Sequence, residues 1–402
     1  MANDVTSLEA IIPMLALAEL RENAILPNLV NSMSSNEMAA KGKKVKINLT
    51  APQIIHTVVP GTDSTAQDIE NQEIEIDVTT HYKGSKFKLS EVDFATIDQG
   101  IVPNKVKEAV RVLANDIEIK ALGEMVNDLG GIYGTNDAPN DTTDIQKTRL
   151  RLDRQLAPMQ GRVFLIDPDT YSEFSVNTTL ASADTTNESR PTIVSGFLGT
   201  RNGFDFHMSQ NIATQNSLSV TSGTAGTNAT LGNNQAVVNG ALAKGKLTMN
   251  LDGAGLASGT IKKGQKFKFA GLDQEFTLSA DATFSSNAAT GVTFLPMLQH
   301  AIADDTTVTF YRTFTLNGVA FTKDVMTIAY LDFMPLDSGL GVVVEEAQDE
   351  ITGAKMRLLK QYKNYEVTYE LQVCYGVKVV QGAYGTILGT FSGAGTSPIA
   401  SA

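Results

Sequence analysis

Cysteine is almost absent from this chain of 402 residues, which contains only Cys374. A single cysteine cannot form a disulfide within the chain, so cystine cross-links are excluded as a source of stability. Cys374 lies in an apolar alternating run, where a thiol is most often buried as a small hydrophobic side chain. We therefore expect packing to stabilise the fold.

Basic charge is also scarce. Lys and Arg number 32 against 44 Asp and Glu, which gives a formal net charge of -12. A dedicated nucleic-acid-binding protein needs clustered Lys and Arg to neutralise phosphates, so this balance argues against that class. The 42% hydrophobic and 19% charged residues are typical of a folded protein. The length predicts two or more hydrophobic cores.

Long apolar runs are missing as well. No segment approaches the ~18 uncharged apolar residues that a membrane-spanning helix needs. Residues 10–18 superficially resemble the core of a signal peptide, but Asp4 and Glu9 precede them and Pro13 interrupts them. We therefore expect a soluble protein that is made inside the cell and has no membrane partner.

The usual signatures of an enzyme are not found. The histidines lie in four separate segments without HExxH or another paired metal spacing: His56, His81, His207 and His300. Neither a G-x-S-x-G elbow nor a phosphate-binding G-x-x-x-x-G-K-[ST] loop occurs. Residues 136–141 lack the central Gly and the closing Glu of a calcium loop, which favours a solvated loop before a helix. We predict no catalytic residue, no metal and no cofactor.

The N-terminal residues 1–32 predict an amphipathic arm. Its apolar residues follow helical spacing at Leu8, Ile11, Ile12 and Leu15. Pro13 suits the start of a helix, and Pro27 suits its end. Because the arm has no obvious partner within the chain, we expect it to be needed for assembly and not for folding.

A different pattern follows from Lys41 to Phe94, where apolar and charged residues alternate. The alternation is clearest in residues 73–78 and 86–89, and it predicts half-buried antiparallel strands. A turn at residues 60–64 lies between the strands. Together these segments predict a long two-stranded excursion.

Residues 103–129 predict the longest helix, opened by Pro103 and stopped by Gly130 and Gly131. At ~1.5 Å per residue it is about 40 Å long. An apolar stripe recurs every three or four residues: Val106, Val110, Leu113, Ile117, Ala121 and Met125. Charged and polar residues fall largely off that stripe: Lys105, Glu108, Asn115, Glu118 and Asp128.

Shorter elements come next. Residues 144–156 predict a second helix, capped by Thr142 or Thr143 and stopped at Pro158. Residues 163–166 predict a buried strand, and residues 167–169 then start a short helix. Near the end of the chain, alternation predicts two strands, at residues 365–371 and 376–380.

The composition changes abruptly between Gly203 and Tyr311. These 109 residues contain no Arg and only 13 charged residues. Short alternating strands occur there, as in residues 246–249 and 265–269, separated by glycine-containing turns. Lys262, Lys263, Lys266 and Lys268 form the densest basic patch, which more often keeps a strand edge soluble than binds phosphate. We predict an inserted β-domain.

Three sequence motifs resemble segments of the coat proteins of tailed bacteriophages. Residues 163–171, VFLIDPDTY, resemble that family's strand-to-helix step, and residues 318–329, GVAFTKDVMTIA, are similar to its re-entry segment. Residues 259–271, GTIKKGQKFKFAG, resemble the inserted domain of the Salmonella short-tailed phage coat protein. The resemblance runs over nearly the whole chain, although the N-terminal arm and the residues after Leu388 match no family pattern.

The resemblance implies an α+β fold of the Hong Kong 97 phage type with an inserted small β-barrel. It implies an N-arm at residues 1–40, an extended E-loop at 41–95, an inserted domain at 213–312 and a C-terminal segment at 381–402. The peripheral domain would comprise residues 96–160 and 346–380, with its spine helix at 103–129. The apical domain would comprise residues 161–212 and 313–345.

The resemblance also implies a function and partners. The chain would be a major capsid protein whose hexamers and pentamers form an icosahedral shell, assembled in the cytoplasm of a bacterial host. A scaffolding protein, a portal, packaged double-stranded DNA without base-specific contacts and a possible cement protein would be its partners. Candidate contacts between subunits are Leu8, Ile12, Leu15, Lys83, Lys86, Lys262 and Lys263. Some members of this family cross-link an E-loop lysine, but Lys83 and Lys86 are more simply solvated or ion-paired.

Two other classes of protein stay open. A surface-layer or tail-tube subunit would suit the Thr, Gly and Asn-rich β-content, although the helix at residues 103–129 fits it poorly. A hydrolase could assemble its site from distant carboxylates, which sequence alone cannot pair.

Overall fold

The fold combines helices, sheets and a small closed β-barrel, in agreement with the predicted α+β class. The structure is a computed structural model. It describes residues 16, 20, 25–33, 44–50, 55, 57–61, 71–78, 81–90, 101–135, 137–177, 198–212, 235–252, 258–311, 314–331, 333, 342–348, 354–364 and 366–391. Contacts divide the chain into unit 1, with residues 1–47, 75–122 and 326–378, and unit 2, with residues 48–74, 123–325 and 379–402.

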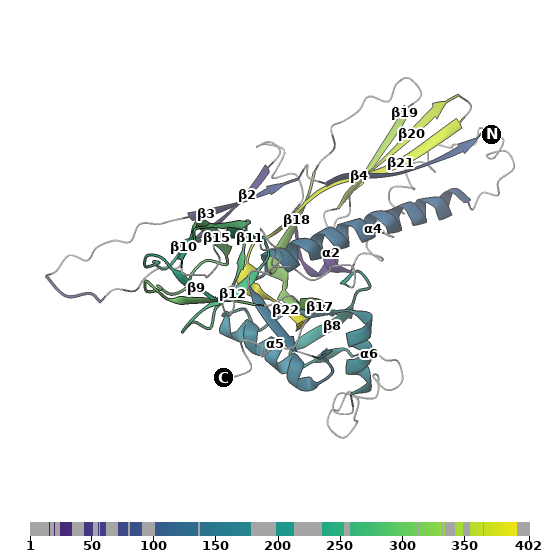
Figure 1. The fold of residues 1–402 in the computed structure, drawn as a ribbon. Helices are drawn as coiled ribbons and strands as arrows, with labels where there is room; N and C mark the ends of the chain where they lie inside the picture. Colours follow the sequence, from purple (N-terminus) through teal and green to yellow (C-terminus); the bar gives the residue numbers. More distant parts are fainter. Residues whose placement is uncertain are drawn as a thin grey trace. The chain divides into compact units, whose positions relative to one another are not determined.

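Unit 1 is built on a six-stranded sheet with the order β1-β18-β21-β20-β19, in which β4 also pairs with β21. Its strands are β1 (Asn31–Met33), β4 (His81–Ser90), β18 (Met326–Tyr330), β19 (Val342–Gln348), β20 (Lys355–Lys363) and β21 (Glu366–Val379). Long antiparallel strands β4, β20 and β21 run side by side in this sheet (Figure 1). Cys374 is buried as predicted, and burial raises the pKa of its thiol to about 11.

The prediction of two terminal strands is wrong, because β21 continues through Gly376 without a break. A Cβ atom at Gly376 would lie 2.6 Å from the Asp77 carbonyl oxygen. Glycine is therefore required here for a close approach of two backbones, and it does not mark the end of a strand.

The arm is partly integrated into unit 1. β1 pairs in parallel with β18, and Leu26 and Val30 are buried. Pro27 lies in the first turn of α2 (Leu26–Leu29), and residues 21–24, where the predicted helix before it would end, lie outside the described residues. The expectation that the arm has no partner within the chain is wrong, because β1 extends the sheet. Leu8, Ile12 and Leu15 lie outside the described residues.

The excursion contains β2 (Lys44–Thr50) and β3 (Asn71–Asp77), which form a two-stranded sheet. Ile74 and Ile76 are buried and Glu75 is exposed, as the alternation predicts. Residues 86–89 do not belong to this pair, because they lie in β4 and pair with β21. Partner choice between strands depends on residues far apart in the sequence, and alternation carries no information about it.

The long helix is α4 (Ile101–Asp128), close to the predicted range. All residues of the predicted apolar stripe are buried. Glu118 and Asp128, which lie off that stripe, are buried too. Ala114 and Leu122 are also buried, which shows that the helix is covered over a wider arc than one stripe.

Unit 2 contains a second six-stranded sheet with the order β5-β22-β17-β6-β8-β7. The strands are β5 (Gly131–Thr135), β6 (Arg162–Ile166), β7 (Thr200–Arg201), β8 (Phe204–Met208), β17 (Phe314–Thr322) and β22 (Gly385–Phe391). The predicted buried strand is β6, in which every residue is buried. Its core includes Phe164, Phe204 and Phe206.

Two helices accompany this sheet, α5 (Thr142–Arg154) and α6 (Pro168–Val176). The N-cap of α5 is Asp141, in a capping box with Asp144, so the predicted cap at Thr142 or Thr143 is wrong by one or two residues. The carboxylate of Asp141 is a better acceptor for the free N–H groups than a threonine hydroxyl. Asp167 caps α6, as its sequence predicts.

The β-barrel of unit 2 follows the strand order β10-β15-β13-β12-β16-β9 and closes on itself. Its strands are β9 (Gln235–Val238), β10 (Thr248–Asp252), β12 (Lys266–Phe269), β13 (Glu275–Leu278), β15 (Ala289–Leu295) and β16 (Thr307–Phe310). A separate pair is formed by β11 (Ser258–Ile261) and β14 (Ala282–Ser285). The barrel has its own core, which includes Phe267, Phe269, Phe276, Phe284, Phe294 and Phe310.

Candidate functional site

The most unusual group of side chains in unit 2 lies on one face of the β12–β13 hairpin. Phe267 and Phe276 pair across the hairpin and fill the barrel core. Because side chains alternate along a strand, Lys266, Thr277 and Glu275 point out of the barrel. All three are buried, so this outward face packs against other parts of unit 2. We call it the junction face.

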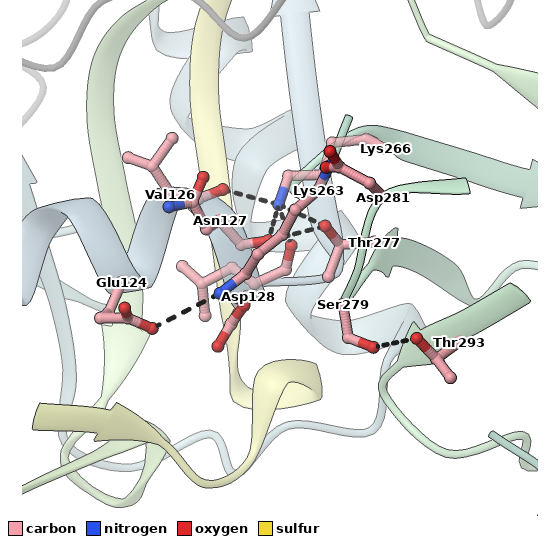
Figure 2. A network of polar contacts seen from close by, with 11 residues as sticks. Glu124, Val126, Asn127, Asp128, Lys263, Lys266, Thr277, Ser279, Asp281 and Thr293 are labelled. Atoms are coloured by element: carbon pink, nitrogen blue, oxygen red, sulfur yellow. Dashed lines mark hydrogen bonds and ion pairs between the residues drawn. The ribbon is translucent and has the colours of Figure 1, made fainter. Parts of the chain in front are cut away.

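Lys266 is directed at the carboxyl end of α4, where helix carbonyl groups lack helical partners (Figure 2). Its Nζ donates to the carbonyl oxygens of Val126 at 2.7 Å and Asn127 at 3.4 Å, and also to that of Leu129. It further donates to Thr277 Oγ1 at 3.1 Å, which in turn donates to the Asn127 carbonyl oxygen at 2.7 Å. A lysine from the barrel therefore caps the long helix.

Burial governs the pKa of Lys266. Desolvation of the ammonium lowers its pKa from 10.5 to about 7. The Asp128 and Glu275 carboxylates act in the opposite direction, and the Lys263 ammonium adds to the lowering. The prediction that Lys266 keeps a strand edge soluble is wrong, because the barrel is closed at this strand and the side chain is buried.

Lys262 and Lys263 flank the junction face. Lys263 Nζ lies 3.3 Å from Asp128 Oδ1 and 3.9 Å from Glu124 Oε2, both on the last turns of α4 (Figure 2). Lys262 forms an exposed ion pair with Asp281 at 2.8 Å. Both predicted contact residues thus have acidic neighbours inside their own chain.

Glu275 provides the matching anion. Its carboxylate accepts from the Ile132 N–H of β5 at 2.7 Å and from Tyr311 Oη at 2.7 Å, and it lies 3.2 Å from Arg151 Nη1 of α5. Burial raises the pKa of Glu275, while Arg151 acts to lower it. Glu275 therefore holds the start of β5 in the way that Lys266 holds the end of α4.

Gly130, between α4 and β5, allows the barrel to come this close. A Cβ atom there would lie 2.7 Å from the Glu275 carbonyl oxygen and 2.7 Å from Pro296 Cδ. The glycine pair was predicted as a helix stop, and α4 does end before it. Glycine is required at position 130 because any side chain there would collide with the barrel.

The other predicted contact residues lie in unit 1. Lys83 is exposed on β4, in register with Val373 of β21. Lys86 is exposed as well, and its Nζ lies 3.5 Å from Glu370 Oε2. The simpler interpretation of an ion-paired lysine thus applies to Lys86.

A network of polar side chains joins the long strands of unit 1. Arg357 of β20 donates to Gln372 Oε1 of β21 at 2.7 Å and to Tyr82 Oη of β4 at 2.8 Å. Its guanidinium lies 4.5 Å from the centre of the Phe333 ring. Sequence reasoning missed this network and the junction face, because the same alternation predicts polar residues whether they face solvent or another element.

Several large apolar side chains are exposed in the described chain. Ile55 is 98% exposed and Val58 is 78% exposed, both within residues 41–95, and Val112 on α4 is 53% exposed. Within the described residues, no group of three or more His, Cys, Asp or Glu side chains could hold a metal ion. The helices in the same residues include none with the length and apolarity for crossing a bilayer.

No protein-family model and no curated protein matches the chain. Among solved structures it is similar to a chain from Mycobacterium phage Che8, with 15% identity, coverage of 91% of this chain and 90% of that one, and a TM-score of 0.49. A chain from the capsid of cyanophage P-SCSP1u has 14% identity, coverage of 92% and 89%, and a TM-score of 0.47. A chain from the mature capsid of bacteriophage PhiM1 has 9% identity, coverage of 92% and 87%, and a TM-score of 0.47.

Proposed function

We propose that the chain is the major capsid protein of a tailed phage and assembles into an icosahedral shell around double-stranded DNA. The observation that carries this proposal is the order of elements along the chain. A two-stranded excursion, β2 and β3, precedes a helix of 28 residues, and the closed barrel interrupts the chain between β8 and β17. This is the order that the resemblance in sequence implies.

The finer architecture belongs to the same proposal. The fold would be of the Hong Kong 97 type, with α4 as the spine helix of a peripheral domain and β2 and β3 in the E-loop. Strands β6, β8 and β17 would belong to the apical domain, and their sheet also includes β5 from the peripheral range and β22 from the C-terminal segment. The barrel strands, which lie between residues 235 and 310, would be the core of the inserted domain at 213–312.

Exposed apolar side chains support a role in assembly. Shell subunits cover part of their apolar surface only when neighbours bind. On the excursion Ile55 is almost entirely exposed and Val58 is largely exposed, and Val112 is exposed on α4. Burial of side chains of this size contributes about 1.5–3 kcal/mol each, so these positions favour contact with another copy.

The acidic composition is compatible with a container for DNA. A net charge of -12 gives no overall excess of basic charge, and a shell needs none because it encloses the genome without sequence recognition. Hexamers and pentamers, a scaffolding protein, a portal and a possible cement protein are the partners that such a shell requires or can use. Assembly would take place in the host cytoplasm.

Negative-stain electron microscopy tests the proposal. The full chain, overexpressed with and without the scaffolding protein of its phage, should give closed icosahedral particles in at least one condition. Replacement of both Ile55 and Val58 with Ser should reduce particle yield without loss of soluble subunit. Flat lattices or tubes from the unaltered chain would instead indicate a surface-layer or tail-tube subunit.

A further inference from the structure

Buried charges on the barrel meet the two ends of neighbouring elements in unit 2. The carboxyl end of a helix has free carbonyl groups, and the first residues of a strand have free N–H groups. Lys266 donates to the carbonyl groups at the end of α4, and Glu275 accepts from an N–H group at the start of β5. In register, Lys266 lies opposite Thr277, and Lys268 lies opposite Glu275. Lys266 and Glu275 therefore both come from the β12–β13 hairpin.

The barrel has what it needs to fold without this contact. Its sheet is closed, and its apolar core is formed by its own strands. The contacts that the described residues make across the junction face include polar ones, among them the flanking ion pair Arg154–Asp273 at 3.5 Å. Water can replace polar partners when such an interface separates, whereas separation of an apolar interface would expose hydrophobic surface.

We propose that the β12–β13 hairpin is a hydrogen-bonded latch. Lys266 and Glu275 hold the barrel against the end of α4 and the start of β5, and the barrel leaves this position as a folded body when the latch opens. Opening returns water to both buried polar groups, which offsets part of the lost hydrogen bonding. The free-energy difference between the closed and open positions of the barrel is thereby small compared with the free energy of unfolding.

Proton binding provides an independent signature of the latch. The groups facing Lys266 are Asp128 and Glu275, which favour its charge, and Lys263, which opposes it. The groups facing Glu275 are Arg151, Tyr311 and Lys268. The closed latch binds a proton on Lys266 less tightly than the open latch does, because the closed pKa is about 7 and the solvated value is 10.5.

The sign of the pH dependence follows. The contribution of Lys266 to closure is present above pH 10.5 and is lost as pH falls through 7. Glu275 acts in the opposite sense, because its pKa is raised: its contribution is present below its ordinary pKa and is lost as pH rises through the raised value. From pH 7 to pH 8.5 the contribution of Lys266 therefore strengthens closure, and the comparison with a variant that keeps its proton isolates that contribution from the one of Glu275.

Hydrogen exchange of the full chain, followed by mass spectrometry, tests the latch. Peptides over residues 126–135 report the end of α4 and β5, and peptides over β15 report the barrel. After correction for intrinsic rates, wild-type protection at residues 126–135 should rise more than tenfold from pH 7 to pH 8.5, since one pH unit corresponds to about tenfold for a single titrating group. Lys266→Arg, which keeps its proton throughout, should lack this rise.

Variants at pH 8 separate latch opening from unfolding. Lys266→Met should speed exchange at residues 126–135 at least tenfold and leave β15 unchanged. Thr277→Val, which removes one acceptor for Lys266 and the bond to the Asn127 carbonyl, should give a smaller effect of the same kind. Lys262→Met is the matched control, because Lys262 lies just before β12 and is exposed. This variant should change exchange in neither region.

Three outcomes would overturn the proposal. The first is equal acceleration in β15 and residues 126–135 in the Thr277→Val chain, which would mean that barrel and junction open only by unfolding together. The second is a wild-type profile whose pH dependence between pH 7 and pH 8.5 equals that of Lys266→Arg. The third is unchanged exchange in both regions of the Lys266→Met chain. If Lys266→Met does not fold, the wild-type pH profile and the Thr277→Val variant still test the proposal.

Discussion

Tyr375 of β21 donates a hydrogen bond to Asp116 of α4, with 2.7 Å between Tyr375 Oη and Asp116 Oδ2. The Tyr375 ring is fully buried, and burial raises the pKa of its hydroxyl, with the Asp116 carboxylate acting in the same direction. Within unit 1, this bond joins the longest strand of the sheet to the long helix. It fixes the rotation of the helix about its axis at that point.

Tyr375→Phe should therefore destabilise unit 1 while preserving its packing volume. Removal of the hydroxyl leaves the carboxylate without this donor, and loss of a hydrogen bond to a charged group costs about 1.5–3 kcal/mol. Urea unfolding of the subunit measures the change. Tyr362→Phe is the control, because Tyr362 is 52% exposed; equal losses from the two variants would contradict the assigned role of the bond.

Arg357 should be the most sensitive position of the polar network in unit 1. Its guanidinium is buried, with partners on two strands and the Phe333 ring. Arg357→Met should lower the free energy of unfolding by about 2–3 kcal/mol, because Gln372 and Tyr82 lose a charged donor. Lys88→Met removes only an exposed pair with Glu366 at 3.0 Å and should cost less than about 1 kcal/mol. Thermal unfolding in which Lys88→Met is the more damaging change would count against the network.

Elements with a strong local signal could be predicted from the sequence, and their partners could not. Pro103, the apolar periodicity and the glycine pair after the helix predicted both ends of α4 to within two residues. The drop in charged residues after Gly203 indicated the β-rich segment. The pairing of β4 with β21 joins residues almost 300 positions apart, for example His81 and Tyr375, and no local pattern carries that information. Lys266 was misjudged for the same reason, since alternation predicts an outward side chain and not what covers it.

Deletion of residues 1–33 should destabilise the subunit as well as impair assembly. β1 is a strand of the sheet in unit 1, and the buried side chains of the arm include Leu20, Leu26 and Val30. Loss of burial at three such positions predicts a cost above about 3 kcal/mol. A shorter deletion of residues 1–15, which leaves β1 in place, is the control for assembly alone. Urea midpoints that are the same for both deletions would show that β1 contributes nothing to folding.

Residues 213–312 should fold as an isolated fragment. The barrel closes on itself and contains its own aromatic core, so no strand edge of the barrel depends on the rest of the chain. In the fragment Lys266 and Glu275 would be hydrated, so their burial penalty disappears. The fragment should be soluble and give a dispersed amide NMR spectrum, and Lys266→Met should leave that spectrum folded. A collapsed spectrum for the unaltered fragment would refute its independence.

Glu118 and Glu108 provide the sharpest comparison on α4. Glu118 lies off the apolar stripe, and replacement of an exposed residue there by Ala would change stability by only ~0.5 kcal/mol. It is 2% exposed, whereas Glu108, ten residues earlier on the same helix, is exposed. Truncation of a buried carboxylate leaves its neighbours unsatisfied and opens a cavity, so Glu118→Ala should cost about 2–4 kcal/mol.

Glu108→Ala, at an exposed position, should stay within about 0.5 kcal/mol of wild type. Ile117→Asp, which places an unpaired charge on the fully buried stripe, should cost several kcal/mol and abolish soluble subunit. Urea unfolding of the two glutamate variants beside wild type, with soluble yield for Ile117→Asp, ranks the three positions. The expected order of cost is Ile117, then Glu118, then Glu108. A Glu118→Ala chain as stable as Glu108→Ala would mean that the second buried face of α4 contributes nothing to folding.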